Sequence, residues 1–507
     1  MTGTSHAASR RMKTAVPLVV AVLLGTGCAA GPDFHKPAPP NAASYTRDPL
    51  PAMTASADVP GGQAQRFLSG RDIPADWWSL FHSEPLNALV AQTLAQNPNL
   101  QSAEAALRAA MENVRAQQGA YFPTVSANLS ASREKAPATL APPLNSDALL
   151  FSLYQTQLTA SWTPDIFGAN RRQVESLTAL ADAQRFRVEA TYLALTANVV
   201  AAAIQEAALR AKIEAIQSVA QSTSDALEIL RRQVNLGQIA GAEVAAQEAA
   251  LAAVRQELPP LEKALAQQRD LLTALAGRLP DDEIEQTFDV SSLVLPQDLP
   301  VSLPSALVAR RPDVRAAEGL LHAASAEIGV AAANMLHNIT LTAVDGSVAT
   351  EIGRLLSPGG GFWTLGASLA QPVFQGGTLL ARRRAAEAAY DQAAADYRST
   401  VIAAFQNVAD VLHALQSDGN ALNAAAATEA AAMRSLNIAR RRLELGQTGH
   451  LEFLSAQAAY QRALISRVQA QADRYADTAA LFQALGGGWW NRPYAEGSRD
   501  ASEQRNR

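Results

Sequence analysis

The chain has 507 residues, enough for two or three ordinary domains, and its formal net charge of −5 is mild. No basic stripe with interleaved aromatic side chains occurs, which argues against nucleic acid as a partner. Aromatic residues make up 6% of the chain and alanine is abundant, a composition typical of long helices. The single cysteine, Cys28, excludes an intrachain disulfide.

The N-terminus has the pattern of a secretory signal. Three basic residues between positions 10 and 13 precede an apolar run over residues 15–24, and small residues precede Cys28. The run is too short for a permanent membrane helix. The small residue directly before the only cysteine is similar to the bacterial lipobox, which implies that residues 1–27 are removed and that Cys28 is diacylated. The alternative is an ordinary cleaved signal that happens to contain a cysteine.

Residues 28–83 are expected to form the N-terminal segment that carries the lipid. Eight prolines between positions 32 and 74 predict that it is an extended tether or a strap laid over another surface. After Pro85 an amphipathic helix is expected to run to about Gly119. No later segment approaches about 18 consecutive apolar residues, so strands would have to make any membrane crossing.

The chain contains an internal duplication. "NPNLQSAEAALRAAMENVRAQ" (residues 97–117) matches "RPDVRAAEGLLHAASAEIGVA" (residues 311–331), and four further matches follow in the same order. The last three are a pair of asparagine-valine segments, a pair of Leu-Gly-Gln motifs and a closing "LLTALAG" against "LFQALGG". We therefore divide the chain into a first repeat, a linker, a second repeat and a polar tail, at residues 84–280, 281–303, 304–488 and 489–507.

Two proline-free stretches, residues 170–234 and 378–443, predict one long helix in each repeat. Helices of that length would have to lie along partners, with alanine permitting close approach. Each is expected to end at its Leu-Gly-Gln motif and to be followed by a second helix. Trp489 and Trp490, after the second repeat, are expected to be disordered or to lie near the equatorial belt that the family resemblance given below implies.

Alternation of apolar and polar residues predicts four strands with one wet face. In "TVSANLSAS" (residues 124–132) every second residue is apolar. The strands are expected at about residues 120–132, 153–165, 337–347 and 362–373. They could be surface strands of a soluble sheet. If they lie in a membrane, four strands cannot close a barrel, since known transmembrane barrels begin at about eight, so several copies of the chain would have to share one.

Several segments together resemble the TolC-like outer-membrane efflux proteins, in their lipidated, NodT-type branch. They are "GCAAGPDFHKP", "DWWSLFHSEPLNALVAQTLAQNPNL", "AQQGAYFPTVSANLSAS", "SWTPDIFG", "QPVFQGG" and the two Leu-Gly-Gln motifs. The resemblance covers Cys28 to about Gly488. One departure is Leu336-His337, where the family usually has Phe-Pro before a strand.

The resemblance implies a fold that is mainly α with a membrane β-barrel. Duplicated half-repeats would form a homotrimer with a 12-stranded barrel, four strands per chain, continued by a long periplasmic α-helical barrel. It implies the exit duct of a tripartite efflux system in the outer membrane of a Gram-negative bacterium. The partners would be outer-membrane lipid, a periplasmic adaptor protein and an inner-membrane pump.

The Leu-Gly-Gln motifs are Leu236-Gly237-Gln238 and Leu445-Gly446-Gln447. Glycine tolerates the left-handed backbone that ends a helix. The resemblance implies that these turns lie at the periplasmic tip, contact the adaptor and adjoin a gate. Carried over by position, the gate residues would be Glu243, Leu451 and Glu452. Three copies of a carboxylate near one axis would raise its pKa and form a cation site.

Five arginines lie one or two turns before the Leu-Gly-Gln motifs, where they could clasp neighbouring helices and release them on opening. They are Arg231, Arg232, Arg440, Arg441 and Arg442. The alternative is that they and the glutamates are solvated charges at the tip. His450, in the second turn, is expected at the surface.

Nothing in the sequence predicts catalysis, a metal site or a cofactor. The seven histidines have no ligand spacing, and no P-loop, dinucleotide-binding glycine run or Gly-x-Ser-x-Gly motif occurs. The rival to the duct is a periplasmic coiled-coil scaffold lipoprotein without a pore, with the strands as surface decoration.

Overall fold

The computed structural model describes residues 29–137, 139 and 149–492. Cys28 and the N-terminal signal lie outside the described residues. The chain divides into two compact units. The first comprises Met1–Pro37, Ala106–Gln184 and Ala317–Tyr397, and the second Ala38–Ala105, Arg185–Ala316 and Arg398–Arg507.

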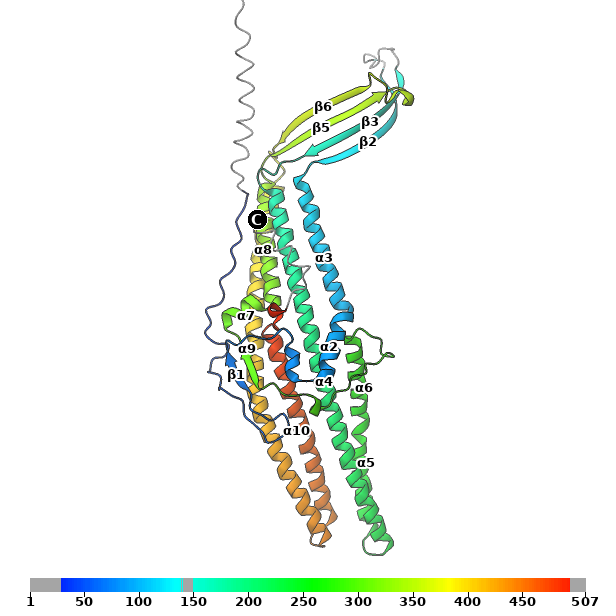
Figure 1. Ribbon diagram of the computed structural model, residues 1–507, viewed down its shortest axis with the longest axis vertical. Helices are drawn as coiled ribbons and strands as arrows, with labels where there is room; N and C mark the ends of the chain where they lie inside the picture. Colours follow the sequence, from blue (N-terminus) through cyan, green and yellow to red (C-terminus); the bar gives the residue numbers. More distant parts are fainter. Residues whose placement is uncertain (1–28, 138, 140–148, 493–507) are drawn as a thin grey trace, which may run out of the picture. The chain divides into compact units, whose positions relative to one another are not determined.

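The first unit contains the four expected strands in one antiparallel sheet (Figure 1). They are β2 (Thr124–Lys135), β3 (Leu150–Trp162), β5 (Asn338–Ala349) and β6 (Gly361–Ala370). The sheet order is β2-β3-β5-β6, so the pairing of β3 with β5 joins the two repeats. The strands begin or end several residues away from the expected bounds, because alternation marks the strand interior better than its ends.

The strand register gathers most of the apolar residues on one face of the sheet, with Asp345 between Leu158 and Trp363 as a charged residue on that face. Val125 pairs with Ala160, Ala160 with Ala343, and Ala343 with Leu365, which makes one row across all four strands. The next row, on the other face, joins Ser126, Thr159, Val344 and Thr364. Val125 and Leu365 are 69% and 73% exposed. The expected separation of an apolar and a more polar face is therefore present.

The two long helices are close to their expected bounds. They are α4 (Ala169–Asn235) and α9 (Thr378–Glu444), of 67 residues each. Asp165 begins α4 by accepting hydrogen bonds from the backbone N–H groups of Asn170 (2.9 Å) and Arg171 (2.7 Å). Within the described chain, α4 is the one helix long and apolar enough to cross a membrane, although 72% of its most apolar window is buried in the protein.

Proline breaks other helices that the sequence analysis treated as continuous. The helix expected from Pro85 to Gly119 is two helices, α2 (Glu84–Gln96) and α3 (Pro98–Gln118). Asn97 between them is extended, with ψ 122°, because the residue before a proline is disfavoured in helical conformation. The second repeat breaks at the equivalent place, between α7 (Pro304–Arg310) and α8 (Pro312–Ala333).

The segments after the two long helices also differ. The first repeat has α5 (Gly241–Gln256) and α6 (Leu258–Leu275), separated at Glu257 before two prolines. The second repeat has a single helix, α10 (His450–Ala484). Within the second unit, the hairpins α4–α5 and α9–α10 have their turns at the same end (Figure 1).

The second unit also contains a two-stranded parallel sheet that sequence analysis missed. It pairs β1 (Arg66–Ser69) with β4 (Asp298–Val301). Both strands have four residues, too few for a recognisable alternation. Short 3₁₀ helices complete the chain: η1 (Trp77–Phe81), η2 (Gly119–Tyr121), η3 (Val290–Ser292), η4 (Ile352–Arg354) and η5 (Trp489–Asn491). Trp489 in η5 donates a hydrogen bond to the Arg310 carbonyl at 2.6 Å, so this part of the tail is packed.

The proline-rich N-terminal segment is a strap in the second unit, held by a buried arginine of α10. Arg474, which is fully buried, donates to the Thr54 hydroxyl at 2.9 Å, to the Gln63 carbonyl at 2.7 Å and to the Gln65 side-chain oxygen at 3.1 Å. A buried charge is tolerated only when its donors are satisfied. The extended chain supplies these acceptors.

Candidate functional site

The two Leu-Gly-Gln motifs form the same helix-ending turn. Gly237 and Gly446 have φ of 72° and 69°, the left-handed conformation that glycine adopts without strain. In the first turn, Gln238 N–H donates to the Gln233 carbonyl at 2.9 Å; in the second, Gln447 N–H donates to the Arg442 carbonyl at 2.8 Å. This bond across six residues is the Schellman motif, which satisfies the last carbonyls of a helix.

Glu243 and Glu452 each lie in the first turn of the helix that follows the turn. The preceding residues, Ala240 and Gly449, have no polar side chain to cap the free N–H groups. A carboxylate there stabilises the helix through its dipole, by about 0.3–1 kcal/mol when exposed. The repeated glutamate therefore has a local role in ending the turn, whatever its part in a gate.

Two of the five arginines join neighbouring helices. Arg231 of α4 contacts Glu248 of α5 at 2.7 Å, and Arg442 of α9 contacts Glu452 of α10 at 2.8 Å. Both pairs are about half-exposed, so each contributes only about 0–1 kcal/mol. The Arg442–Glu452 pair ties one predicted clasp to one predicted gate residue.

The other three arginines do not join helices within the described residues. Arg441 pairs with Glu444 of its own helix at 3.1 Å, and Arg232 donates to the Glu228 carbonyl one turn back at 3.3 Å. For Arg440, no hydrogen bond or ion pair is found in the described part of the chain. Within one chain, two of the five predicted clasps therefore join helices, because side chains on one helix point in different directions; for the other three the role stays a prediction.

His450 is buried, so the expectation of a surface histidine was wrong. It is 7% exposed, and its Nε2 lies 2.8 Å from the side-chain oxygen of Gln247 in α5. Burial lowers the pKa of His450, and the nearby Glu243 opposes this shift. A signal for burial was present in the sequence: His450, Phe453 and Gln457 follow the spacing i, i+3, i+7, and all three are buried.

A ladder of polar contacts extends this junction between the two hairpins. Gln247 donates to the Thr223 carbonyl of α4 at 2.7 Å, and Gln457 of α10 donates to the Thr223 hydroxyl at 2.7 Å. Further along, Gln461 donates to Glu257 at 3.1 Å. The buried amides and hydroxyl are therefore paired with one another, as buried polar groups must be.

The segment that follows Cys28 is held in the first unit by α4 and α8. Arg172 of α4, nearly buried, contacts Asp33 at 2.7 Å and donates to the Ala30 carbonyl at 3.1 Å. Ala30 N–H donates to the carbonyl of Phe167, in the loop before α4, at 2.9 Å. Lys36 contacts Glu318 of α8 at 2.9 Å.

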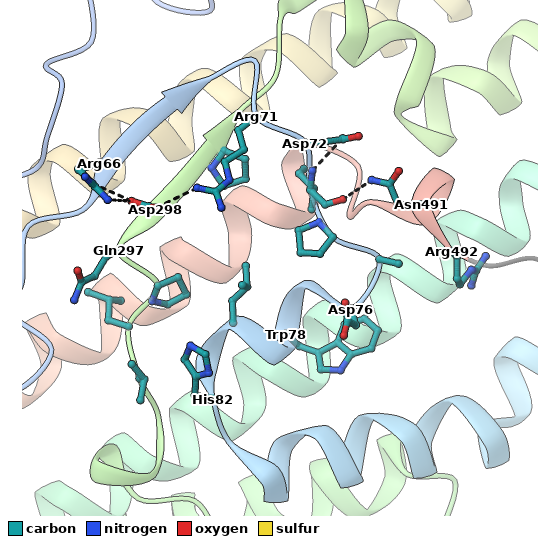
Figure 2. Close-up of a pocket in the computed structure, with 18 of the residues that line it drawn as sticks. Arg66, Arg71, Asp72, Asp76, Trp78, His82, Gln297, Asp298, Asn491 and Arg492 are labelled. Carbon is teal, nitrogen blue, oxygen red and sulfur yellow. Dashed lines mark hydrogen bonds and ion pairs between the residues drawn. The ribbon is translucent and has the colours of Figure 1, made fainter.

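A cavity of about 1120 Å³ in the second unit does not involve the turns. Figure 2 shows its wall beside the small parallel sheet, where Arg66 and Arg71 both reach Asp298, at 2.7 and 3.1 Å. Asp72 on the same wall contacts Arg310 at 3.0 Å and accepts a bond from Trp490 at 3.0 Å. Several of the charged side chains that line this cavity are thus paired with one another or with other residues of the protein.

Across residues 29–137, 139 and 149–492, no group of three or more histidine, cysteine, aspartate or glutamate side chains could hold a metal ion. The candidate site is therefore the pair of turns with the helix ends beside them.

Comparison with known proteins agrees with the resemblance drawn from the sequence. Residues 89–278 and 303–487 match the family described as outer membrane efflux protein. The chain is 30% identical over 487 residues to the probable efflux pump outer membrane protein TtgC of Pseudomonas putida, covering 95% of this chain and 96% of that protein. It is 32% identical over 486 residues to the outer membrane protein OprJ of Pseudomonas aeruginosa, covering 93% and 95%.

Solved structures show the same fold. The outer-membrane channel OprN superposes with a TM-score of 0.80 at 27% identity, covering 91% of this chain and all of that chain. The open state of the Neisseria gonorrhoeae MtrE outer membrane channel superposes with a TM-score of 0.77 at 25% identity, covering 92% of this chain and all of that one.

These findings confirm the expected fold class, mainly helical with one four-stranded antiparallel sheet and of the type found in trimeric TolC-like channels. They also select a channel over a scaffold without a pore, and a transport role over a catalytic one. The chain belongs to the outer membrane efflux protein family and is an outer-membrane channel of an efflux pump system.

Proposed function

We propose that three copies of this chain form a passive exit duct, which conducts substrates from the periplasm to the exterior and closes at the hairpin turns. The observation that supports this most strongly is the sheet of the first unit. Its edge strands, β2 and β6, have no further strand partner in the described chain, and its apolar face is exposed.

An open edge cannot remain in a bilayer. Each unpaired backbone group in hydrocarbon costs several kcal/mol, as a rough estimate, and β2 alone has 12 residues. Pairing β6 of one copy with β2 of the next removes both edges. Three sheets of four strands then close a 12-stranded barrel, with the row of Val125 and Leu365 toward lipid.

The gate would be formed by residues just after the turns. Leu451 is 77% exposed and would present an apolar ring on a threefold axis, while Glu452 and Glu243 would add carboxylates. The Arg442–Glu452 pair would hold α10 to α9 in the closed state, and its modest strength suits a contact that must break.

The tripartite arrangement completes the proposal. The turns would contact a periplasmic adaptor, and an inner-membrane pump would supply both the energy and the selection of substrate. Cys28 would carry the lipid anchor, since Ala30, two residues after it, is bonded to Phe167 in the loop that joins β3 to α4.

The test is conductance of the purified protein in planar bilayers. Wild type is expected to run as a heat-sensitive, SDS-resistant trimer and to form pores of low current. Leu451→Ala combined with Glu452→Ala should raise the single-channel current, because it removes the apolar ring and the clasp together. Glu444→Ala removes a glutamate paired only within α9. It is the control variant and should have the single-channel current of wild type.

Unchanged current in the double variant would contradict the proposed gate, and a monomer without pores would contradict the proposed duct.

A further inference from the structure

His450 occupies a position that couples the buried junction between the hairpins to the predicted gate. It is the first residue of α10 and directly precedes Leu451 and Glu452. Leu451 is 77% exposed whereas His450 is 7% exposed. One helical turn therefore has its gate side chain on one face and its anchor to α5 on the other.

The hydrogen bonds around His450 define its protonation state. The Gln247 amide nitrogen donates to the Thr223 carbonyl, so the Gln247 oxygen is the atom that faces His450. Nε2 of His450 must then carry a proton and donate, which leaves Nδ1 as the unprotonated nitrogen. Nδ1 is buried and has no hydrogen-bond partner among the described residues. The neutral ring leaves Nδ1 as an unpaired acceptor, whereas a second proton there would make a buried, charged donor without an acceptor, which is the more costly state.

Charges near His450 do not offset that cost. Glu243, in the first turn of α5, is the carboxylate that acts on the ring. On α9 and α10, Arg442 and Glu452 pair with each other, and on α4 and α5, Arg231 pairs with Glu248. The N-terminus of α10 itself disfavours a cation, since its free N–H groups are the positive end of the helix dipole.

The direction of the pH effect follows from burial. Burial lowers the pKa of His450 below its ordinary value of 6.5, with Glu243 opposing the shift. A released, solvated ring would take up a proton near that ordinary value, whereas the packed ring resists it. The packed arrangement is therefore fully stable above about pH 6.5, and it loses stability as the pH falls from there through the lowered pKa.

We propose that His450 is a gate-positioning residue: its neutral ring holds the first turn of α10, with Leu451 and Glu452, against α5, and its protonation releases that turn. Resting on the proposed channel function, this makes the closed gate sensitive to acid in the periplasm. The contact would act as a latch between the two hairpins of one protomer, in addition to the Arg442–Glu452 clasp.

The experiment compares open probability in planar bilayers between about pH 7.5 and about pH 5.5. For wild type we expect a rise of about threefold or more, because protonation of a released ring with the ordinary pKa of about 6.5 can shift the equilibrium by up to about tenfold between about pH 7.5 and about pH 5.5. His450→Gln cannot take up a proton and should abolish most of the rise. Gln247→Leu, which removes the acceptor, should raise the open probability already at about pH 7.5.

Two further variants act as controls. His413→Gln removes an exposed histidine of α9 and should titrate like wild type. Asp418→Asn removes a carboxyl whose pKa is raised to about 7 by burial and by neighbouring Asp477, so that the native Asp418 titrates over the same pH range as the proposed latch. This variant should still show the rise in open probability at low pH. A wild-type rise that persists in His450→Gln, or disappears in Asp418→Asn, would overturn the assignment to His450. Pore current that is constant from about pH 7.5 to about pH 5.5 would refute this inference alone, whereas the absence of current would refute the proposed function.

Discussion

At the scale of single residues, the two turn glycines have the clearest physical requirement. A Cβ added to Gly237 or Gly446 would meet no atom within 4 Å, so space does not demand glycine. The positive φ does, because other residues in the left-handed region incur a backbone cost of about 1–2 kcal/mol. The same backbone state at both turns is what allows the same hydrogen bonds in both.

This predicts a contrast between two alanine substitutions. Gly446→Ala should lower the free energy of unfolding of the local hairpin by about 1 kcal/mol and reduce capture of the adaptor, with trimers intact. Gly241→Ala, at the first helical position of α5, should be neutral or slightly stabilising because alanine favours helix. Hydrogen exchange of the turn amides and adaptor pull-down measure the two effects. Equal behaviour of both variants would show that the positive φ is not what matters.

At the scale of elements, the two faces of the four-stranded sheet are expected to face different surroundings, lipid on one side and the water-filled lumen on the other. Leu365 and Thr364 are neighbours on β6 but belong to opposite rows. Leu365 shares its row with Ala343 and Ala160, whereas Thr364 shares its row with Val344 and Thr159. In a barrel the first row would face lipid and the second the lumen.

Arginine at these two positions should therefore have unequal effects. Leu365→Arg is expected to cost about 2–4 kcal/mol if it lies near the bilayer midplane, and to reduce the amount of SDS-resistant trimer in outer-membrane fractions. Thr364→Arg should insert normally and alter ion selectivity. Trimer yield on unheated gels and the reversal potential in a salt gradient distinguish the outcomes. Normal insertion of Leu365→Arg would count against a lipid-facing row.

At the scale of the whole molecule, two kinds of membrane attachment are expected in one chain, a lipid on Cys28 and a barrel made from β2, β3, β5 and β6. The described segment next to Cys28 is also fixed by protein contacts, chiefly Arg172 with Asp33 and Lys36 with Glu318. Two acyl chains on Cys28 would anchor the chain stably, but a closed barrel is a stable insertion without them.

Cys28→Ser should accordingly remove incorporation of labelled palmitate without releasing the protein from the outer membrane. Trimers and pore current should persist, because the barrel and the Arg172 contacts do not depend on the lipid. Membrane fractionation with palmitate labelling provides the measurement, and an Asp33→Asn variant tests the protein contact separately. Recovery of the serine variant in the soluble periplasmic fraction would contradict barrel insertion.

Much of the architecture could be predicted because it depends on patterns of residues that are close together in the sequence. The 3.6-residue period and the absence of proline placed α4 and α9 within one residue of their observed ends. Alternation located the four strands, and the repeated Leu-Gly-Gln motif located the left-handed glycines of the two turns, Gly237 and Gly446. Each of these features depends on residues close together in the chain, so the sequence by itself determined them.

Contacts between distant segments were decided only by the tertiary structure. The pairing of β1 with β4, the burial of Arg474 under the strap and the bond from His450 to Gln247 join residues about two hundred or more positions apart. Whether an arginine reaches a neighbouring helix depends on how both helices are rotated about their axes. The local sequence pattern does not specify how one helix is rotated relative to the other. The periodicity of the sequence predicts which face of its own helix a side chain occupies. Which residue it contacts depends on how the whole unit packs.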